Sequence, residues 1–294
     1  MVYCKNVLFI LGLILALDSY CTTQEINKDE PTPYHDWDYI VYSQRWPITA
    51  CIDWQEEKEG NTCNLPDDKT MWTIHGLWPT KNGTKGPLFC PSAIHFDPNA
   101  LEPIINELNS SWINIEANTK PNSFWKHEWA KHGTCASTLP QLDSILNYFQ
   151  QGLVWNEQYK LSDILTQSKV IPGTEGYTID QIYNAVKLST QSTPIIQCTV
   201  DRKTKESMIS EIQICFNKSL EVVDCDQFQT DNENKLGILT DCSLKKPVMY
   251  FAEIPNGVSY EMDYVDSAFK QHLDEHIYYL SIYRLLRFLI WYTT

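Results

Sequence analysis

Short β-type runs alternate with stretches of helical spacing through residues 37–256. Runs at 39–42 and 71–75 predict strands, and a period of two puts Met71, Thr73 and His75 on one face of the second, which is expected to end at Gly76. Helical spacing is found at 98–108, 122–131, 141–152 and 178–189, and further β-type runs at 194–200, 208–216, 219–224 and 247–252. The pattern predicts one α+β domain, without internal repeats.

The first 21 residues predict a signal peptide. Lys5 precedes the apolar stretch 7–17, and Ser19 and Cys21 are small residues suited to cleavage before Thr22. The stretch is shorter than the roughly 20 residues that a membrane span requires. Residues 22–36 are polar and form a lead-in to the domain.

The segment 257–294 lies beyond the predicted domain. Its stretch 277–292 is apolar except for Ser281, Arg284 and Arg287, whose spacing of three makes one polar stripe on a helix. Three interpretations stay open for this amphipathic tail: docking on its own domain, contact with a membrane interface, and self-association. The two arginines argue against a spanning segment.

Composition describes a globular protein with an acidic surface. Hydrophobic residues make up 43% of the chain and charged residues 20%, and the formal net charge is −14. This charge opposes the basic surface by which proteins neutralise nucleic-acid phosphates. Binding to RNA would therefore need a local site, and an acidic compartment would favour it because carboxylates are neutralised there.

Cysteine usage indicates an oxidising compartment. Cys4 and Cys21 leave with the signal peptide, and an even set of eight remains: Cys51, Cys63, Cys90, Cys135, Cys198, Cys215, Cys225 and Cys242. No CxxC pair is present, which disfavours a zinc site. Acceptor sequons for glycosylation occur at Asn82, Asn109 and Asn217. We expect a secreted or lysosomal glycoprotein.

Three of the seven histidines fall in two tight clusters, at 72–79 and 124–135. If the second cluster is helical, Glu128 and His132 share a face, and such a carboxylate can orient the imidazole and raise its pKa. His127 and His132 are five apart, which turns them roughly 140° from each other on a helix. The spacing therefore differs from the HExxH zinc motif, and we expect no metal.

The clusters supply two histidines, a lysine and a carboxylate, with no evident serine or cysteine nucleophile. RNA carries its own nucleophile in the 2′-hydroxyl group, so an enzyme needs only to move protons and stabilise charge. DNA lacks this group and cannot react in this way. The residues suit such a reaction, but alone they do not single out RNA.

Four segments resemble the ribonuclease T2 family. TIHGLWP (73–79) and FWKHEWAKHGTC (124–135) are similar to its two catalytic segments. Gln44-Arg45-Trp46-Pro47 is similar to its upstream Q-x-W-P stretch, and Trp112-Ile113-Asn114 resembles its W-P-N stretch, with isoleucine in place of proline. The resemblance spans about residues 37–255. It implies a disulfide-stabilised fold with a central antiparallel β-sheet and packed helices.

The resemblance also implies a role for each matching residue. His75 would be the general acid and His132 the general base, and Glu128, Lys131 and His127 would stabilise the transition state. Trp78 would stack a base, while Phe124, Asn114 and Gln44 would line base subsites; Thr80, after the LWP proline, leaves base preference open. The implied disulfides are Cys51–Cys63, Cys90–Cys135, Cys198–Cys242 and Cys215–Cys225.

The resulting hypothesis is a metal-independent, cofactor-free endoribonuclease with an acid optimum. It would cleave single-stranded RNA, but not DNA, through a 2′,3′-cyclic phosphate to 3′-phosphate ends, as a monomer. One alternative is a secreted binding or signalling protein in which activity is dispensable. A second is a metal-dependent hydrolase that uses the region of His127 and His132.

Overall fold

The computed structural model describes residues 3–6, 19–22, 35–83, 86–225 and 238–255. Strands β1 (Tyr3–Asn6) and β2 (Ser19–Thr22) pair only with each other. Most of the predicted signal peptide and of the lead-in at 22–36 lies outside the described residues. The tail at 257–294 lies wholly outside them, so these three assignments stay predictions.

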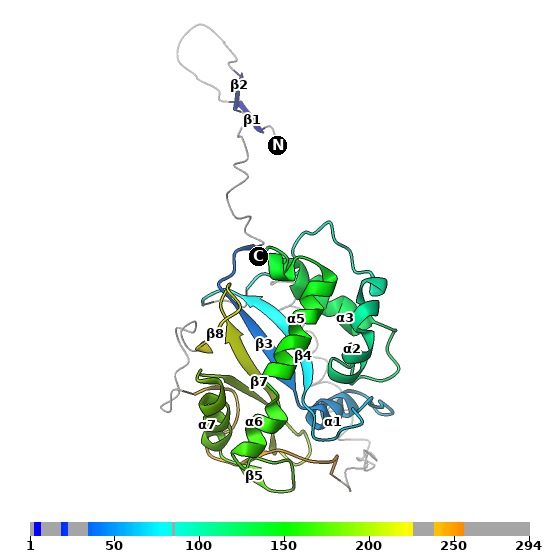
Figure 1. Ribbon diagram of the computed structural model, residues 1–294, viewed down its shortest axis with the longest axis vertical. Coiled ribbons are helices and arrows are strands. Elements are labelled where there is room, and N and C mark those ends of the chain that lie inside the picture. The colour runs from blue at the N-terminus through cyan, green and yellow to red at the C-terminus, as the bar shows by residue number, and fades with distance from the viewer. Residues whose placement is uncertain (1–2, 7–18, 23–34, 84–85, 226–237, 256–294) are drawn as a thin grey trace, which may run out of the picture.

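An eight-stranded sheet forms the centre of the domain (Figure 1). Its main path runs β4, β3, β7, β10, β5, while β6 and β8 also pair with β7, and β9 pairs with β6. The long pairings, β3 with β4 and β7, and β6 with β7, are antiparallel, and the parallel pairings of β10 with β7 and of β6 with β9 span two residues each. The predicted antiparallel sheet is confirmed. The strands are β3 (Tyr39–Arg45), β4 (Thr73–Thr80), β5 (Gly176–Tyr177), β6 (Ile195–Val200), β7 (Ser207–Phe216), β8 (Val222–Val223), β9 (Leu239–Thr240) and β10 (Val248–Met249).

Helices occupy the connections between strands. Ser144 caps α5 by accepting a hydrogen bond from the backbone of Asn147, and Thr178 with Gln181 forms a capping box at α7. Pro47 begins α1 directly after β3, where a proline at the first position loses no helical hydrogen bond. The helices before and after the catalytic segment are α1 (Pro47–Glu57), the 3-10 helix η2 (Pro98–Ile104), α2 (Ile105–Ser111), the 3-10 turn η4 (Pro140–Leu142), α5 (Ile145–Gln158), α6 (Leu161–Gln167) and α7 (Ile179–Thr190).

Several predicted bounds were wrong. The strand expected at 71–75 begins instead at Thr73 and continues through Gly76 and Pro79 to Thr80. Proline has no backbone N–H to donate to a neighbouring strand. It is tolerated at position 79 because β4 is the edge strand of the main path. The helix expected at 141–152 starts at its cap, Ser144, and runs to Gln158. Helices α1 and α6, and the two-residue strands β5 and β9, were not predicted.

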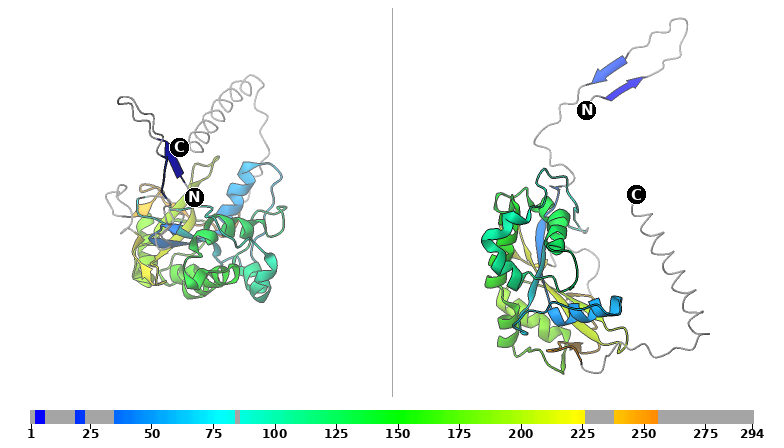
Figure 2. Two further views of the ribbon diagram at one scale, coloured as in Figure 1. Left: turned by 90° about the horizontal axis from the view of Figure 1, so that it is seen from above. Right: turned by 90° about the vertical axis from the view of Figure 1, so that its right-hand side faces the viewer.

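One face of the sheet packs against α5. Ile40 and Tyr42 of β3 and Ile74 and Leu77 of β4 are fully buried there, and the ring of Trp155 on α5 stacks on Phe216 at 3.8 Å. The right-hand view of Figure 2 shows the green helices along this side of the sheet. The opposite face of β3, β4 and β7 carries the buried apolar residues Tyr39, Val41 and Cys215, and beyond them polar side chains such as Arg45 and His75.

Four disulfides link segments of the domain, and their pairs are those that the resemblance implies: Cys51–Cys63, Cys90–Cys135, Cys198–Cys242 and Cys215–Cys225. Cys90–Cys135 holds the end of the helical segment that carries His132 to the loop after β4. No helix within the described ranges is long and apolar enough to cross a membrane.

Candidate active site

The second histidine cluster lies on a helix whose middle turn is widened. Helix α3 (Ser123–Glu128) continues through a π-helical turn, η3 (Trp129–Gly133), into α4 (Thr134–Ala136). A side chain at Gly133 would collide with the ring of Trp129, so the turn depends on this glycine. Turns of this kind are frequent at functional sites, because they change the direction of the side chains around them.

A β-bulge sets the position of the first histidine. Ser43 of β3 is opposite Gly76 and Gln44 is opposite Ile74, so His75 has no partner on β3. The backbone carbonyl of His75 instead accepts a hydrogen bond from Nε1 of Trp112, at 3.0 Å. A bulge redirects the side chain of the extra residue. Here the extra residue is His75, and its strand, β4, borders a cavity.

That cavity, of about 490 Å³, brings the two clusters together. It contains all five predicted catalytic residues and three of the four predicted base-binding residues. Its lining is Arg45, His75, Trp78, Asn114, Glu116, Ser123, Phe124, His127, Glu128, Lys131 and His132.

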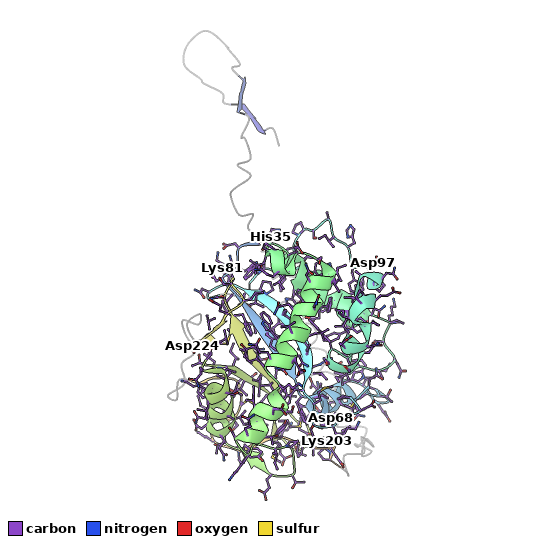
Figure 3. The ribbon with its side chains drawn as sticks, in the orientation of Figure 1. His35, Asp68, Lys81, Asp97, Lys203 and Asp224 are labelled. Carbon is purple, nitrogen blue, oxygen red and sulfur yellow. A yellow bond between two sulfur atoms is a disulfide. The ribbon has the colours of Figure 1, made fainter. Side chains whose placement is uncertain are left out.

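Gln44, the fourth predicted base-binding residue, does not line this cavity. Its side chain is buried on the opposite face of the sheet and donates a hydrogen bond of 2.9 Å to the carbonyl of Tyr159. It borders a separate cavity of about 540 Å³, together with Asp68, which Figure 3 labels near the lower end of β4. Neighbours on a strand face opposite sides, so Arg45 reaches the catalytic cavity in place of Gln44.

Trp78 contacts predicted catalytic residues of both clusters. Its Nε1 donates a hydrogen bond of 3.1 Å to Oε2 of Glu128. Its ring centroid lies 4.9 Å from that of His75 and 5.5 Å from that of His132. A Cβ atom at Gly76 would collide with the Glu128 carboxylate and with the Trp78 indole. The absence of a side chain at Gly76 therefore allows β4 and α3 to approach each other closely.

Burial changes the protonation of His132. Its side chain is 6% exposed, and burial together with the charges of Lys131, His75 and His127 lowers its pKa to about 2. Nδ1 of His132 has no hydrogen-bond partner among the described residues. The sequence suggested that Glu128 would orient His132 and raise its pKa. Instead, the Glu128 carboxylate accepts from Trp78, and burial with the neighbouring positive charges lowers the pKa of His132.

Burial and neighbouring charges shift the pKa values of Glu128 and His127 in opposite directions. Burial raises the pKa of Glu128, against the opposing effects of His75, the Trp78 hydrogen bond, Lys131 and Arg45. Burial and the charges of Lys131 and His75 lower the pKa of His127. A protonated Glu128 can donate a hydrogen bond to a phosphate oxygen without repelling it.

Three charged residues at the site were not predicted. The Arg45 guanidinium lies 4.6 Å from the ring centroid of Phe124, and Glu116 lines the same cavity. Burial lowers the pKa of Arg45, although Glu211, Glu128 and Glu116 oppose this effect. The third residue is Glu211 of β7, whose Oε1 atom lies 2.6 Å from Nδ1 of His75. A single carboxylate in the mostly apolar run 207–216 was the available sequence signal for Glu211.

The predicted glycosylation residues lie away from this cavity. Asn82 and Asn109 are exposed. Asn217 is half-buried, and its side-chain amide donates to Glu221 while its Oδ1 accepts from the backbone of Ser219 and Glu221. Among the residues that the structure describes, no group of three or more His, Cys, Asp or Glu side chains has the geometry of a metal site.

Comparisons with known proteins identify the family. Residues 37–225 match the model of the ribonuclease T2 family. Ribonuclease Oy of Magallana gigas is 38% identical over 218 residues, which are 73% of this chain and 96% of the relative. Extracellular ribonuclease LE of Solanum lycopersicum is 31% identical over 73% of this chain and 89% of its own length.

Solved structures agree with these sequence relatives. The crystal structure of human RNase T2 superposes with a TM-score of 0.59 at 28% identity, covering 74% of this chain and 99% of that chain. A structure of RNase NT in complex with 5′-AMP has a TM-score of 0.56 at 27% identity, with coverages of 65% and 91%. The chain belongs to the ribonuclease T2 family and is a ribonuclease that acts on RNA.

Proposed function

We propose that the protein cleaves single-stranded RNA by acid–base catalysis with His75 and His132, and that it does not cleave DNA. The observation that carries this proposal is the single cavity that both histidines line together with Glu128, Lys131 and His127. The 2′-hydroxyl attacks the adjacent phosphorus and displaces the 5′ oxygen of the next nucleotide. The products are a 2′,3′-cyclic phosphate, which water opens to a 3′-phosphate, and a new 5′-hydroxyl end.

The environments of the two histidines support opposite roles. Burial lowers the pKa of His132 to about 2, so its imidazole is neutral and able to remove the 2′ proton even in acid. Nδ1 of His75 lies 2.6 Å from the Glu211 carboxylate. With Nδ1–H bonded to that carboxylate, Nε2 is the nitrogen that can protonate the departing oxygen.

Charge on the phosphorane is stabilised by the α3–η3 segment. Lys131 supplies a positive charge, and Glu128, whose pKa burial raises, supplies a hydrogen bond at the same cavity wall when it is protonated. The raised pKa of Glu128 and the lowered pKa of His132 both favour activity in acid. We propose an acid optimum and a secreted or lysosomal location; the extracellular name of the tomato relative supports passage through the secretory pathway.

Aromatic side chains around the phosphate site support binding of unpaired bases. Trp78 and Phe124 line the cavity, and both rings lie within 6.0 Å of the His75 ring. Base–aromatic stacking needs bases that are free of a duplex. Relatives in complex with 5′-nucleotides, such as RNase NT with 5′-AMP, are consistent with a nucleotide site here.

The test uses an oligodeoxynucleotide that contains one ribonucleotide. The protein, freed of metal with chelator at pH 5, should cut only after the ribonucleotide and leave a 2′,3′-cyclic phosphate that mass spectrometry detects before the 3′-phosphate. The matched all-deoxy oligonucleotide should stay intact. Cleavage of the all-deoxy strand, or a first product with a 3′-hydroxyl end, would contradict the mechanism.

A further inference from the structure

A carboxylate from a different strand touches the first histidine. Oε1 of Glu211 on β7 lies 2.6 Å from Nδ1 of His75 on β4, although β3 runs between these two strands. The bulge in the β3–β4 pairing leaves His75 without a cross-strand partner, so its side chain is redirected beside that of Glu211. Both side chains are mostly buried, with 28% of His75 and 16% of Glu211 exposed.

The Glu211 carboxylate is itself fixed by its neighbours. Its Oε2 accepts a hydrogen bond of 2.6 Å from Oγ of Ser43 on β3 and one of 3.3 Å from Nε2 of Gln213. Gln213 also donates to Oε1 of Gln197 on β6, at 3.1 Å. Side chains of β3 and β7 thus hold Oε2, and this fixes the carboxylate whose other oxygen, Oε1, faces His75.

Glu211 is ionised in this setting. Burial alone would raise its pKa, but the charge of His75 and the hydrogen bonds from His75, Ser43 and Gln213 outweigh burial and lower the pKa to about 2. Glu211 and His75 together border a second cavity, of about 390 Å³, whose other charged side chains are Arg45, Asp53, Glu57, Glu116 and Asp241.

We propose that Glu211 is a positioning residue for the general acid: it accepts the Nδ1–H of His75 and so directs the Nε2–H towards the departing oxygen. The proposal rests on the proposed role of His75. In the reaction, Nε2 gives its proton to the 5′ oxygen as the P–O5′ bond breaks, and the imidazole becomes neutral while Nδ1–H stays bonded to the carboxylate. No proton passes to Glu211.

A charge-assisted hydrogen bond of this length fixes both the tautomer and the plane of the ring. Loss of the carboxylate would leave the ring free to turn, and the imidazolium would lose a counter-charge. The defect should therefore appear only when the leaving oxygen needs a proton. If Glu211 only stabilised the packing of the strands, its loss would lower the rate on every substrate by the same factor.

The experiment compares RNA with a nucleoside 3′-(4-nitrophenyl) phosphate, whose leaving group departs without protonation. The variants are Glu211→Gln, Glu211→Ala, His75→Ala and the double variant His75→Ala with Glu211→Gln. Glu206→Gln, an exposed residue just before β7, is the matched control for loss of one carboxylate. Circular dichroism and thermal unfolding establish that each variant is folded.

On RNA, we expect Glu211→Gln to lower kcat by about 10- to 100-fold, with KM within about twofold of the wild type. The nitrophenyl ester should react at nearly the wild-type rate. The double variant should be no slower than His75→Ala, because Glu211 acts through His75. Glu206→Gln should match the wild type on both substrates.

Equal losses on both substrates, an unchanged kcat on RNA, or a double variant slower than His75→Ala would overturn the positioning role. Failure of the proposed function is recognised separately. If His75→Ala itself slows both substrates equally, His75 is not the general acid, whatever the Glu211 variants show.

Discussion

Trp78 on β4 donates its indole N–H to the carboxylate of Glu128 on α3, and this bond of 3.1 Å joins the two histidine-bearing segments. Glu128 is 2% exposed, so its second oxygen has little access to water. The bond favours the ionised form of a carboxylate whose pKa is raised by burial. The contact therefore controls both the geometry and the charge of the proposed phosphate site.

Removal of this hydrogen bond should raise the pKa of Glu128. In Trp78→Phe the ring is kept but the donor is lost, so Glu128 stays protonated to a higher pH. The alkaline limb of the pH profile of kcat/KM should then move to higher pH. Weaker stacking by phenylalanine can also lower the rate, but it does not move this limb. Trp54→Phe, which removes an indole bond to the carbonyl of Thr62 outside the cavity, is the control and should leave the limb unchanged.

A methyl group at position 76 should separate the two segments. In Gly76→Ala the new Cβ would occupy space held by the Glu128 carboxylate and the Trp78 indole, so β4 and α3 must move apart. We expect kcat on RNA to fall by at least about 100-fold, since small displacements of catalytic groups have effects of this size. Gly173→Ala, where a methyl group meets no atom within 4 Å, is the matched control. Wild-type kcat in folded Gly76→Ala would show that this approach is not needed.

The pH profile tests the burial of His132. A pKa lowered to about 2 means that the imidazole stays neutral as pH falls, and binds a proton only near that value. The acid limb of kcat/KM should therefore lie well below the ordinary histidine pKa of about 6.5, with activity retained at pH 4. An acid limb near pH 6.5 would contradict a buried, neutral base.

Much of the site was predictable because its chemistry is concentrated in two short segments. His75, Glu128, Lys131 and His132 lie in continuous runs, and the structure places all four around one cavity. Helix α7 was predicted almost to its bounds from helical spacing, and in the structure a capping box marks its start. These signals come from residues that are close together in the sequence, so the sequence alone reveals them.

Other features depend on tertiary contacts. The choice between Gln44 and Arg45 depends on which face of β3 packs against α5, which a seven-residue strand buried throughout does not reveal. Glu211 meets His75 across 136 residues of sequence and one intervening strand. The π turn within 129–133 arises from packing of Trp129 over Gly133, and helical spacing alone predicted a regular α-helix there.

The disulfide Cys90–Cys135 should stabilise the domain more than Cys51–Cys63 does. It spans 45 residues against 12, and chain entropy predicts contributions of about 4 and about 3 kcal/mol. Paired cysteine-to-alanine variants at each bridge, unfolded in urea, measure the difference. The Cys90–Cys135 variant should also lose activity at temperatures where it is still folded, because the bridge holds the end of the helix that carries His132. Equal activity of the two disulfide variants at those temperatures would show that the Cys90–Cys135 bridge has no such role.

The most direct test of the account is the rate of RNA cleavage by wild type, His75→Ala and His132→Ala at pH 5 in excess chelator. The exposed histidine variant His95→Ala serves as the control. We expect full activity of the wild type and of the control without metal, and a loss of about 10²–10⁴-fold in each of the other two variants. A folded wild type that is inactive in chelator and recovers with a divalent ion, or full activity in either His75→Ala or His132→Ala, would contradict it.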